Sequence, residues 1–228
     1  MGTNWHLKEK DFFEGLSEEK KHFLLLSQKR QYRRNEFIFF EGDVGHSAFY
    51  LEKGAVQIFK SSQVGKDLIV WVRKSGELFG LAEIMGEQER KCNARAITDC
   101  LIHRIERRDF EHLLSRHYPM VQRVIQIMGR RVRYLCEQVE NLMVCDVTTR
   151  LLKLFVYLCY QQLAESGAWD QPATLPLSLT QEQMAAMTGT CQQTVSEVLK
   201  RLQEDGVISV ANRCITLVSP TEVLDRLS

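Results

Sequence analysis

A repeating apolar stripe in the middle of the chain constrains the fold more than any other feature. Over three heptads, apolar side chains recur at alternating spacings of four and three, and they are Val121, Ile125, Met128, Val132, Leu135, Val139 and Leu142. This period predicts one long helix, and a two-in-seven stripe is narrower than the face that a helix usually turns to its own core. We therefore favour a dimer seam over packing within one chain. Gly129 costs about 1 kcal/mol in helix propensity, which suggests a close backbone approach or a soft point.

The residues before this helix follow a β-type pattern. From about residue 36 to 107, short apolar runs alternate with turn signals that contain glycine. The runs are residues 37–40, 48–51, 56–59 and 68–72. Short strands at intervals of about ten residues predict a sandwich or barrel. Residues 1–35 are charged and amphipathic, and Leu24, Leu25 and Leu26 are the expected anchor of a helix.

A second compact unit is expected after a loop at residues 166–172. Thr180 and Gln183 form a capping-box pattern, residues 190–193 repeat it, and Gly189 lies between the two. Two short helices joined by a glycine turn predict a helix-turn-helix. The expected inward positions are Met184, Ala185, Met187, Val195, Val198 and Leu199. Residues 206–210 and 214–218 then predict a hairpin around Asn212, which would form a wing.

The charge of this unit is opposite to the usual expectation for a nucleic-acid binder. The 228 residues carry a net charge of +1, whereas residues 146–228 hold six basic and nine acidic side chains, a net charge of −3. Such a unit can still bind DNA if basic and helix N-terminal groups face the phosphates. We expect its affinity to be modest and sharply salt-dependent, with a shallower salt slope than that of a strongly basic binder. The phosphate-contact candidates are Thr180, Thr190, Thr194, Lys200, Arg201 and Arg213. The base-reading candidates are Gln192, Gln193, Ser196 and Glu197, although Glu197 could also be a solvated surface carboxylate.

Several classes of protein lack support in the sequence. No stretch reaches the roughly 18 apolar residues of a membrane span, and residues 1–10 show no signal peptide, so we expect a cytoplasmic protein. Seven cysteines without paired spacings argue against a disulfide framework. The chain shows no nucleophile–base spacing and no zinc-ligand cluster, and residues 76–80 lack the Lys-Ser/Thr of a phosphate loop. We therefore expect neither an enzyme nor a metal site.

Four stretches together resemble the CRP/FNR family of bacterial transcription regulators. Residues 39–43 and 51–54 look like the start of its cyclic-nucleotide-binding β-roll, and residues 76–96 are similar to its phosphate-binding cassette. Residues 141–150 resemble its hinge, and the helix-turn-helix is the fourth stretch. The resemblance implies an α+β fold with a sensory β-roll domain at residues 1–118, a dimerisation helix and hinge at 119–145, and a winged helix-turn-helix at 146–228.

The resemblance also implies a function. The protein would be a homodimer that binds a palindromic operator in double-stranded DNA, with half-sites one turn, or about 34 Å, apart. A small-molecule effector would act at the β-roll and dimer helix, and RNA polymerase is an implied partner. Most members carry Arg and Glu where this chain has Gln192 and Gln193, and Arg where it has Glu197. We therefore predict an operator that differs from the family's usual half-sites.

The effector site departs from the family at most polar positions. In cyclic-AMP-binding members a Glu holds the ribose where this chain has Leu81, a Ser stands at Lys91, and a Thr-Ser pair contacts adenine at Leu135 and Cys136. Only Arg90 is kept, which argues against cyclic AMP because buried ligand hydroxyls would lack partners. Arg90 with Lys91 could hold another anion, or Arg90 could form only a structural ion pair. The candidate effector residues are Phe79, Gly80, Leu81, Arg90, Lys91, Leu135 and Cys136.

The sequence also bears on three other sensing chemistries, namely an iron–sulfur cluster, haem and a thiol switch. No cysteine precedes Cys92, which argues against an N-terminal iron–sulfur cluster. Haem stays an open alternative, since the chain has six histidines (His6, His22, His46, His103, His112 and His117). A thiol switch would use Cys92, Cys100, Cys136 or Cys145, although buried cysteines mostly act as small hydrophobes. The competing function is a small-anion, redox or haem sensor with weakened DNA binding.

Overall fold

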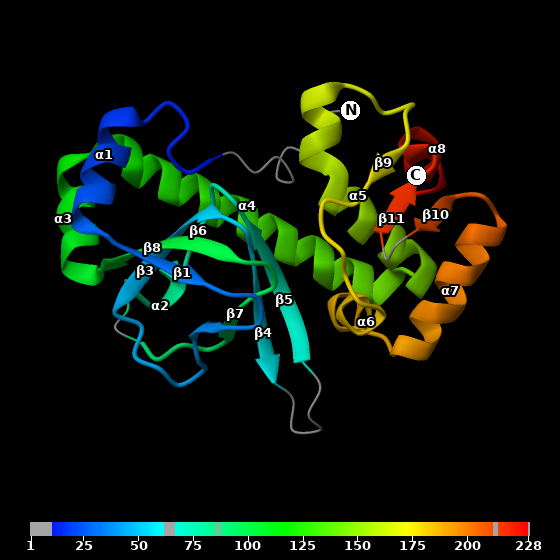
Figure 1. The fold of residues 1–228 in the computed structure, drawn as a ribbon, viewed down its shortest axis with the longest axis horizontal. Coiled ribbons are helices and arrows are strands. Elements are labelled where there is room, and N and C mark those ends of the chain that lie inside the picture. The colour runs from blue at the N-terminus through cyan, green and yellow to red at the C-terminus, as the bar shows by residue number, and fades with distance from the viewer. Residues whose placement is uncertain (1–10, 62–66, 85, 87, 212–213, 228) are drawn as a thin grey trace. The chain divides into compact units, whose positions relative to one another are not determined.

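The computed structural model describes residues 11–61, 67–84, 86, 88–211 and 214–227, which form two compact units. The N-terminal unit includes residues 11–129 and the C-terminal unit residues 130–227. The division falls within one long helix, α4 (Tyr118–Val144), which lies where the apolar stripe predicts a long helix (Figure 1). The three predicted domain boundaries stay a prediction.

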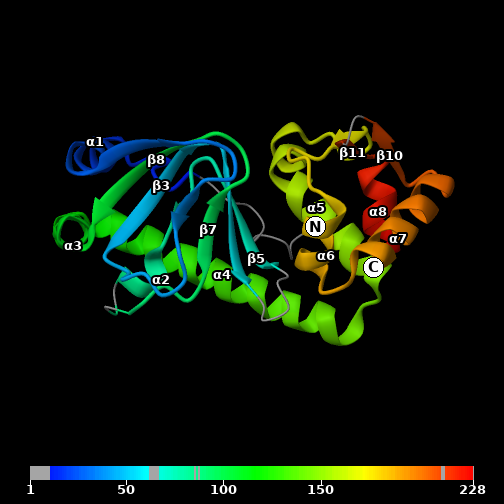
Figure 2. The same ribbon diagram turned by 60° about the horizontal axis from the view of Figure 1, so that its bottom comes forward.

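Two antiparallel sheets form the N-terminal unit, as the short apolar runs predict. The first sheet has the order β1 (Gln28–Tyr32), β8 (Cys100–Glu106), β3 (Ser47–Lys53) and β6 (Leu78–Phe79). The second has the order β2 (Phe37–Phe39), β7 (Asn93–Ala96), β4 (Ala55–Ser61) and β5 (Asp67–Lys74). Both sheets are visible in Figure 2. The α+β fold class is therefore confirmed.

Strand β3 shows how this unit is held together, because it is buried on both faces. Successive side chains of a strand point to opposite faces. Phe49 packs in the cluster that contains residues of both sheets, such as Val56 and Ala94. Tyr50, its neighbour, packs in a second cluster with the helices α1 (Ser17–Leu26), α3 (Arg107–Arg116) and the first part of α4. One sheet therefore separates two hydrophobic cores.

The N-terminal helix is present, but its predicted anchor is wrong in part. Phe23 is the buried residue of α1 and Leu24 is half-buried against the core, whereas Leu25 is 81% exposed. Because consecutive residues of a helix point in different directions, Leu24, Leu25 and Leu26 do not lie on one face. Strand β1 was also not expected, because its residues are polar and mostly exposed. It exists through its pairing with β8, where Gln28 lies opposite Arg104.

The C-terminal unit contains the predicted helix pair and wing. Helix α5 (Val147–Ser166) precedes α6 (Gln181–Thr188) and α7 (Gln192–Glu204), and β10 (Ile208–Ala211) pairs with β11 (Cys214–Leu217). The short strand β9 (Ala173–Thr174) adds to β11, and α8 (Pro220–Arg226) follows. Asn212 lies outside the described residues. Among the helices that the structure describes, none is long and apolar enough to cross a membrane.

Candidate nucleic-acid interface and effector site

The turn between α6 and α7 is built from local hydrogen bonds. The Thr180 hydroxyl accepts a hydrogen bond from the Gln183 N–H at 3.1 Å, and the Gln183 side-chain oxygen accepts one from the Thr180 N–H at 2.9 Å. This confirms the first predicted capping box. Helix α6 ends at Gly189, whose φ of 63° is the left-handed conformation that glycine adopts without strain.

The second predicted capping box is wrong. The N–H of Thr190 still donates to the Ala185 carbonyl at 3.1 Å, so Thr190 completes the end of α6. Helix α7 therefore begins one residue later, with Cys191 as its N-cap and no side-chain cap bond. A hydrogen bond with the Thr194 hydroxyl lowers the pKa of the exposed Cys191 thiol. Cys191 is not among the predicted site residues, although it directly precedes the start of α7.

The base-reading candidates share one face of α7. Its inner face buries Val195, Val198, Leu199 and Leu202. Helix α6 buries Met184, Ala185 and Thr188, while the predicted Met187 is only half-buried. The outer face exposes Gln192, Gln193, Ser196 and Glu197. The Gln193 side-chain amide donates to the Glu197 carboxylate at 3.2 Å, so these two side chains already hold each other in a defined arrangement.

The phosphate-contact candidates differ in the exposure and the hydrogen bonding of their side chains. Lys200 is exposed and lies 3.8 Å from Glu204, an exposed pair that contributes little to stability. The Arg201 guanidinium donates to the Thr148 hydroxyl at 2.5 Å, which ties α7 to the first turn of α5. The hydroxyls of Thr180 and Thr194 are engaged within their own helix starts, and Thr190 is half-buried. Arg213 lies outside the described residues.

The apolar stripe of α4 is exposed in this chain. Val132 is 61% exposed, and Ile125, Leu135, Val139 and Leu142 are also exposed, while Val121 and Met128 are half-buried. A different set of α4 residues packs inward, namely Met120, Ile127, Tyr134 and Asn141. A Cβ at Gly129 would meet nothing within 4 Å, so no close backbone approach occurs within one chain. One face of α4 therefore packs within the chain, and a second, apolar face is exposed.

Within residues 76–96, the predicted cassette, Arg90 is 2% exposed. Its Nη1 donates to the Glu83 carboxylate and to the Gly80 carbonyl, each at 2.9 Å, and its Nη2 donates to the Ser47 carbonyl. Phe79 and Leu81 are buried beside this site. Lys91 is exposed. Arg90 therefore forms the structural ion pair that the sequence analysis kept as an alternative, and its partner Glu83 was missed because no local pattern marks it.

Leu135 and Cys136, the remaining effector candidates, are exposed on α4 within the C-terminal unit. Of the other thiols, Cys100 is buried and donates to the Ala55 carbonyl at 3.2 Å. Burial raises the pKa of both Cys92 and Cys100, which disfavours the reactive thiolate. Cys145 is half-buried beside Asn141.

Three of the six histidines, His22, His103 and His117, contact other side chains of the protein. His103 is buried and shares hydrogen bonds with Glu52 at 2.6 Å and Ser27 at 3.3 Å. His22 and His117 contact each other at 3.1 Å on the surface. Within the part of the chain that the structure describes, no group of three or more His, Cys, Asp or Glu side chains could hold a metal ion. His6 lies outside that part.

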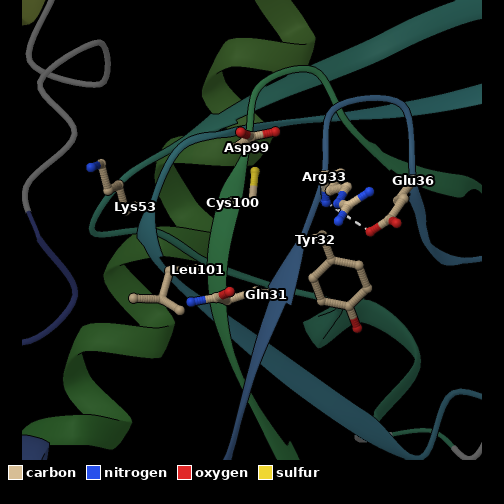
Figure 3. A pocket seen from close by; sticks show the side chains of 8 residues that line it. All are labelled: Gln31, Tyr32, Arg33, Glu36, Lys53, Asp99, Cys100 and Leu101. Atoms are coloured by element: carbon tan, nitrogen blue, oxygen red, sulfur yellow. Dashed lines mark hydrogen bonds between the residues drawn. The ribbon is translucent and has the colours of Figure 1, made fainter.

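An open pocket of about 630 Å³ lies at the ends of β1 and β8 (Figure 3). Its lining consists of Gln31, Tyr32, Arg33, Glu36, Lys53, Asp99, Cys100 and Leu101. Glu36 accepts a hydrogen bond from the Arg33 N–H, and Asp99 accepts one from the Arg34 N–H, so both carboxylates hold turns of the backbone. The pocket contains none of the predicted effector residues.

Comparisons with known proteins match both units. Residues 29–117 match the cyclic nucleotide-binding domain family, and residues 149–225 match the Crp-like helix-turn-helix domain family. The cAMP-activated global transcriptional regulator CRP of Salmonella typhimurium is 26% identical over 196 residues, which is 86% of this chain and 91% of that protein.

Two solved structures show the same fold. A CooA mutant from Carboxydothermus hydrogenoformans has a TM-score of 0.76 at 18% identity, over 96% of this chain and 97% of that one. The c-di-GMP responsive global regulator CLP of Xanthomonas campestris has a TM-score of 0.73 at 22% identity, over 89% of this chain and 99% of that one. Because both domains match in order and the relatives align over most of their length, the chain belongs to the CRP/FNR family of DNA-binding transcription regulators, which are not enzymes.

Proposed function

We propose that this protein is a homodimeric regulator that reads a palindromic operator through α7 and responds to an effector other than cyclic AMP. The observation that carries the proposal is the outer face of α7. Four polar side chains, Gln192, Gln193, Ser196 and Glu197, are exposed together on a helix whose opposite face is buried. A recognition helix needs this division, because its inner face holds it on the domain while its outer face enters the major groove.

The dimer is supported by the uncovered stripe of α4. Exposed apolar side chains at positions such as Val132 and Val139 keep the spacing of a two-stranded seam, while Ile127 and Tyr134 already serve the chain's own packing. A second copy of α4 would cover this stripe. A symmetric dimer would then present two α7 helices to two half-sites about one DNA turn apart.

The effector proposal rests on the cassette. Leu81 is buried where a nucleotide ribose would need a hydrogen-bond partner, and the Arg90 guanidinium is already bonded to Glu83. The names of the relatives associate this fold with different effectors, cyclic AMP in one case and c-di-GMP in another. The fold therefore does not set the effector, and the side chains of this chain argue against cyclic AMP.

Specificity would depend on a few placed contacts more than on a basic surface. The side-chain amide of glutamine can make two hydrogen bonds to adenine, donating through its NH2 group and accepting through its oxygen, and a glutamate can accept from the amino group of cytosine. Gln193 and Glu197, which contact each other, would contact neighbouring bases as one unit. The net charge of −3 over residues 146–228 supports the same conclusion, since few phosphates would be neutralised. The setting we propose is the cytoplasm, with RNA polymerase as a partner on DNA.

The experiment is selection of binding sites from random duplex DNA by the full-length protein. We expect enrichment of palindromes with half-sites about one turn apart and with a half-site other than TGTGA or TTGAT. Enrichment of either of those half-sites would contradict the predicted change of operator. No enrichment at all, from a folded protein at low salt, would contradict the function.

The acidic C-terminal unit also favours a second candidate, a sensor whose DNA binding has weakened. A gel shift against the region upstream of its own gene, at two salt concentrations, separates the two functions. A regulator binds that region in preference to unrelated DNA at both concentrations. A weakened sensor shows only binding that is lost at the higher salt.

A further inference from the structure

Glu83 contacts the buried Arg90, although no local pattern in the sequence marks it. Glu83 is the only carboxylate within ion-pair distance of Arg90 among the described residues, at 2.9 Å, and its side chain is 15% exposed. Arg90 is bounded on its other sides by two backbone carbonyls and by the ring of Phe39, 4.5 Å from the guanidinium carbon. All of these contacts to the buried Arg90 guanidinium are made by other groups of the protein.

A buried guanidinium needs a compensating charge. Leaving a buried charge without its partner is strongly destabilising, so a cation with 2% exposure needs an anion beside it. Burial lowers the pKa of Arg90, and the nearby Glu83 opposes that shift. Glu83 therefore supplies the negative charge that a bound phosphate would otherwise supply to Arg90.

The surrounding backbone holds Glu83 in this place. Leu81 and Ile84 on the same short helix, α2 (Leu81–Ile84), are buried in the core and fix its orientation. Gly45 lies against the other side of Glu83, since a Cβ on Gly45 would lie 2.5 Å from the Glu83 Cβ. Gly80, with a φ of 72°, lets the guanidinium approach, because a Cβ there would lie 3.1 Å from Nη1 of Arg90. Two glycines thus make room for the ion pair on both sides.

We propose that Glu83 is an intramolecular ligand of Arg90 that excludes phosphate and phosphodiester anions from the cassette, and so determines which effectors the β-roll accepts. An anionic effector reaches Arg90 only by displacing Glu83. An effector that leaves the ion pair intact carries no phosphate group at this position. The inference rests on the proposed function only in taking the β-roll as the effector domain.

The test is isothermal titration calorimetry of the full-length protein with inorganic phosphate and with cyclic AMP. Glu83→Gln removes the charge and keeps the shape, and Glu89→Gln, at an exposed carboxylate directly before Arg90 in the chain, is the matched control. We expect Glu83→Gln to bind phosphate at least about tenfold more tightly than the wild type and Glu89→Gln, since like charges in one site repel strongly. Equal affinities in the three proteins, or no binding to any of them, would overturn the proposal.

A second measurement covers poor folding of Glu83→Gln. If its thermal midpoint is lowered, phosphate should restore it in a concentration-dependent manner, and should not do so for Glu89→Gln. Destabilisation that phosphate does not relieve would also overturn the proposal. Operator binding by the wild type is scored separately, so that a failure of the proposed function and a failure of this inference give different results.

Discussion

The Cδ2 atom of Leu142, near the end of α4, lies 2.9 Å from the position that a Cβ on Gly189 would occupy in the turn between α6 and α7. Gly189 is therefore constrained by its φ of 63°, and a Cβ there would also require the exposed Leu142 side chain to shift. We expect Gly189→Ala to destabilise the C-terminal unit by about 1–3 kcal/mol. Urea unfolding measures the loss.

Gly167 provides a matched control for this substitution. It also ends a helix, with a φ of 67°, but a Cβ there would meet nothing within 4 Å. Gly167→Ala should therefore lose only the cost of the backbone conformation, roughly 1 kcal/mol. Equal losses for the two variants would show that the contact between Leu142 and Gly189 contributes nothing.

A charge in the exposed stripe of α4 should separate the proposed dimer. Val132→Glu would place an unpaired carboxylate in the seam, which we expect to raise the dimer dissociation constant by about 100-fold or more. Gln126→Glu, an exposed position outside the stripe, adds the same charge as a control. Sedimentation equilibrium gives both constants. An unchanged dissociation constant for Val132→Glu would show that the dimer interface does not include this part of α4.

Two substitutions on α7 should weaken DNA binding in different ways. Lys200→Ala removes an exposed cation, so affinity should fall for all sequences and the salt slope should decrease by about 1. Gln193→Ala should cost about 1–3 kcal/mol at one operator position and leave the slope unchanged. Fluorescence anisotropy over a salt series measures both. If Lys200→Ala changed the base preference, Lys200 would be a base-reading residue and not only a phosphate contact.

The stability of the N-terminal unit should depend on pH through Glu52. Its hydrogen bond with His103, together with the nearby Lys29, holds the pKa of the Glu52 carboxyl below its ordinary value of 4.5. Because the folded pKa is the lower one, the stabilisation is complete above pH 4.5 and is lost as the pH falls through the folded value.

Unfolding of Glu52→Gln and wild type over the acid range tests this dependence. The difference in unfolding free energy between the two proteins should shrink below pH 4.5. Glu140→Gln, at an exposed carboxylate of α4, controls for the loss of one negative charge. A difference that stays constant down to the acid transition would mean that the His103 contact does not favour the ionised carboxylate.

Local patterns in the sequence predicted much of the architecture. The heptad stripe placed a long helix where α4 lies, and Thr180 with Gln183 marked the start of α6 correctly. Both signals involve residues three or four apart, whose hydrogen bonds and side-chain contacts form within one turn of helix. Such features are fixed by neighbours along the chain, so a single sequence is enough to find them.

The tertiary structure decided which partner each side chain meets. Thr190 matches a cap pattern but completes α6, since the turn at Gly189 brings its N–H to Ala185. Strand β1 has no apolar alternation and exists only through its pairing with β8, about seventy residues away. The sequence left open whether Arg90 holds an anion or forms a structural ion pair, and the fold places the Glu83 carboxylate 2.9 Å from its guanidinium. The sequence by itself determined most of the elements and the family resemblance, whereas long-range packing decided which charges meet in the cassette, because burial and pairing depend on residues that meet only in the folded chain.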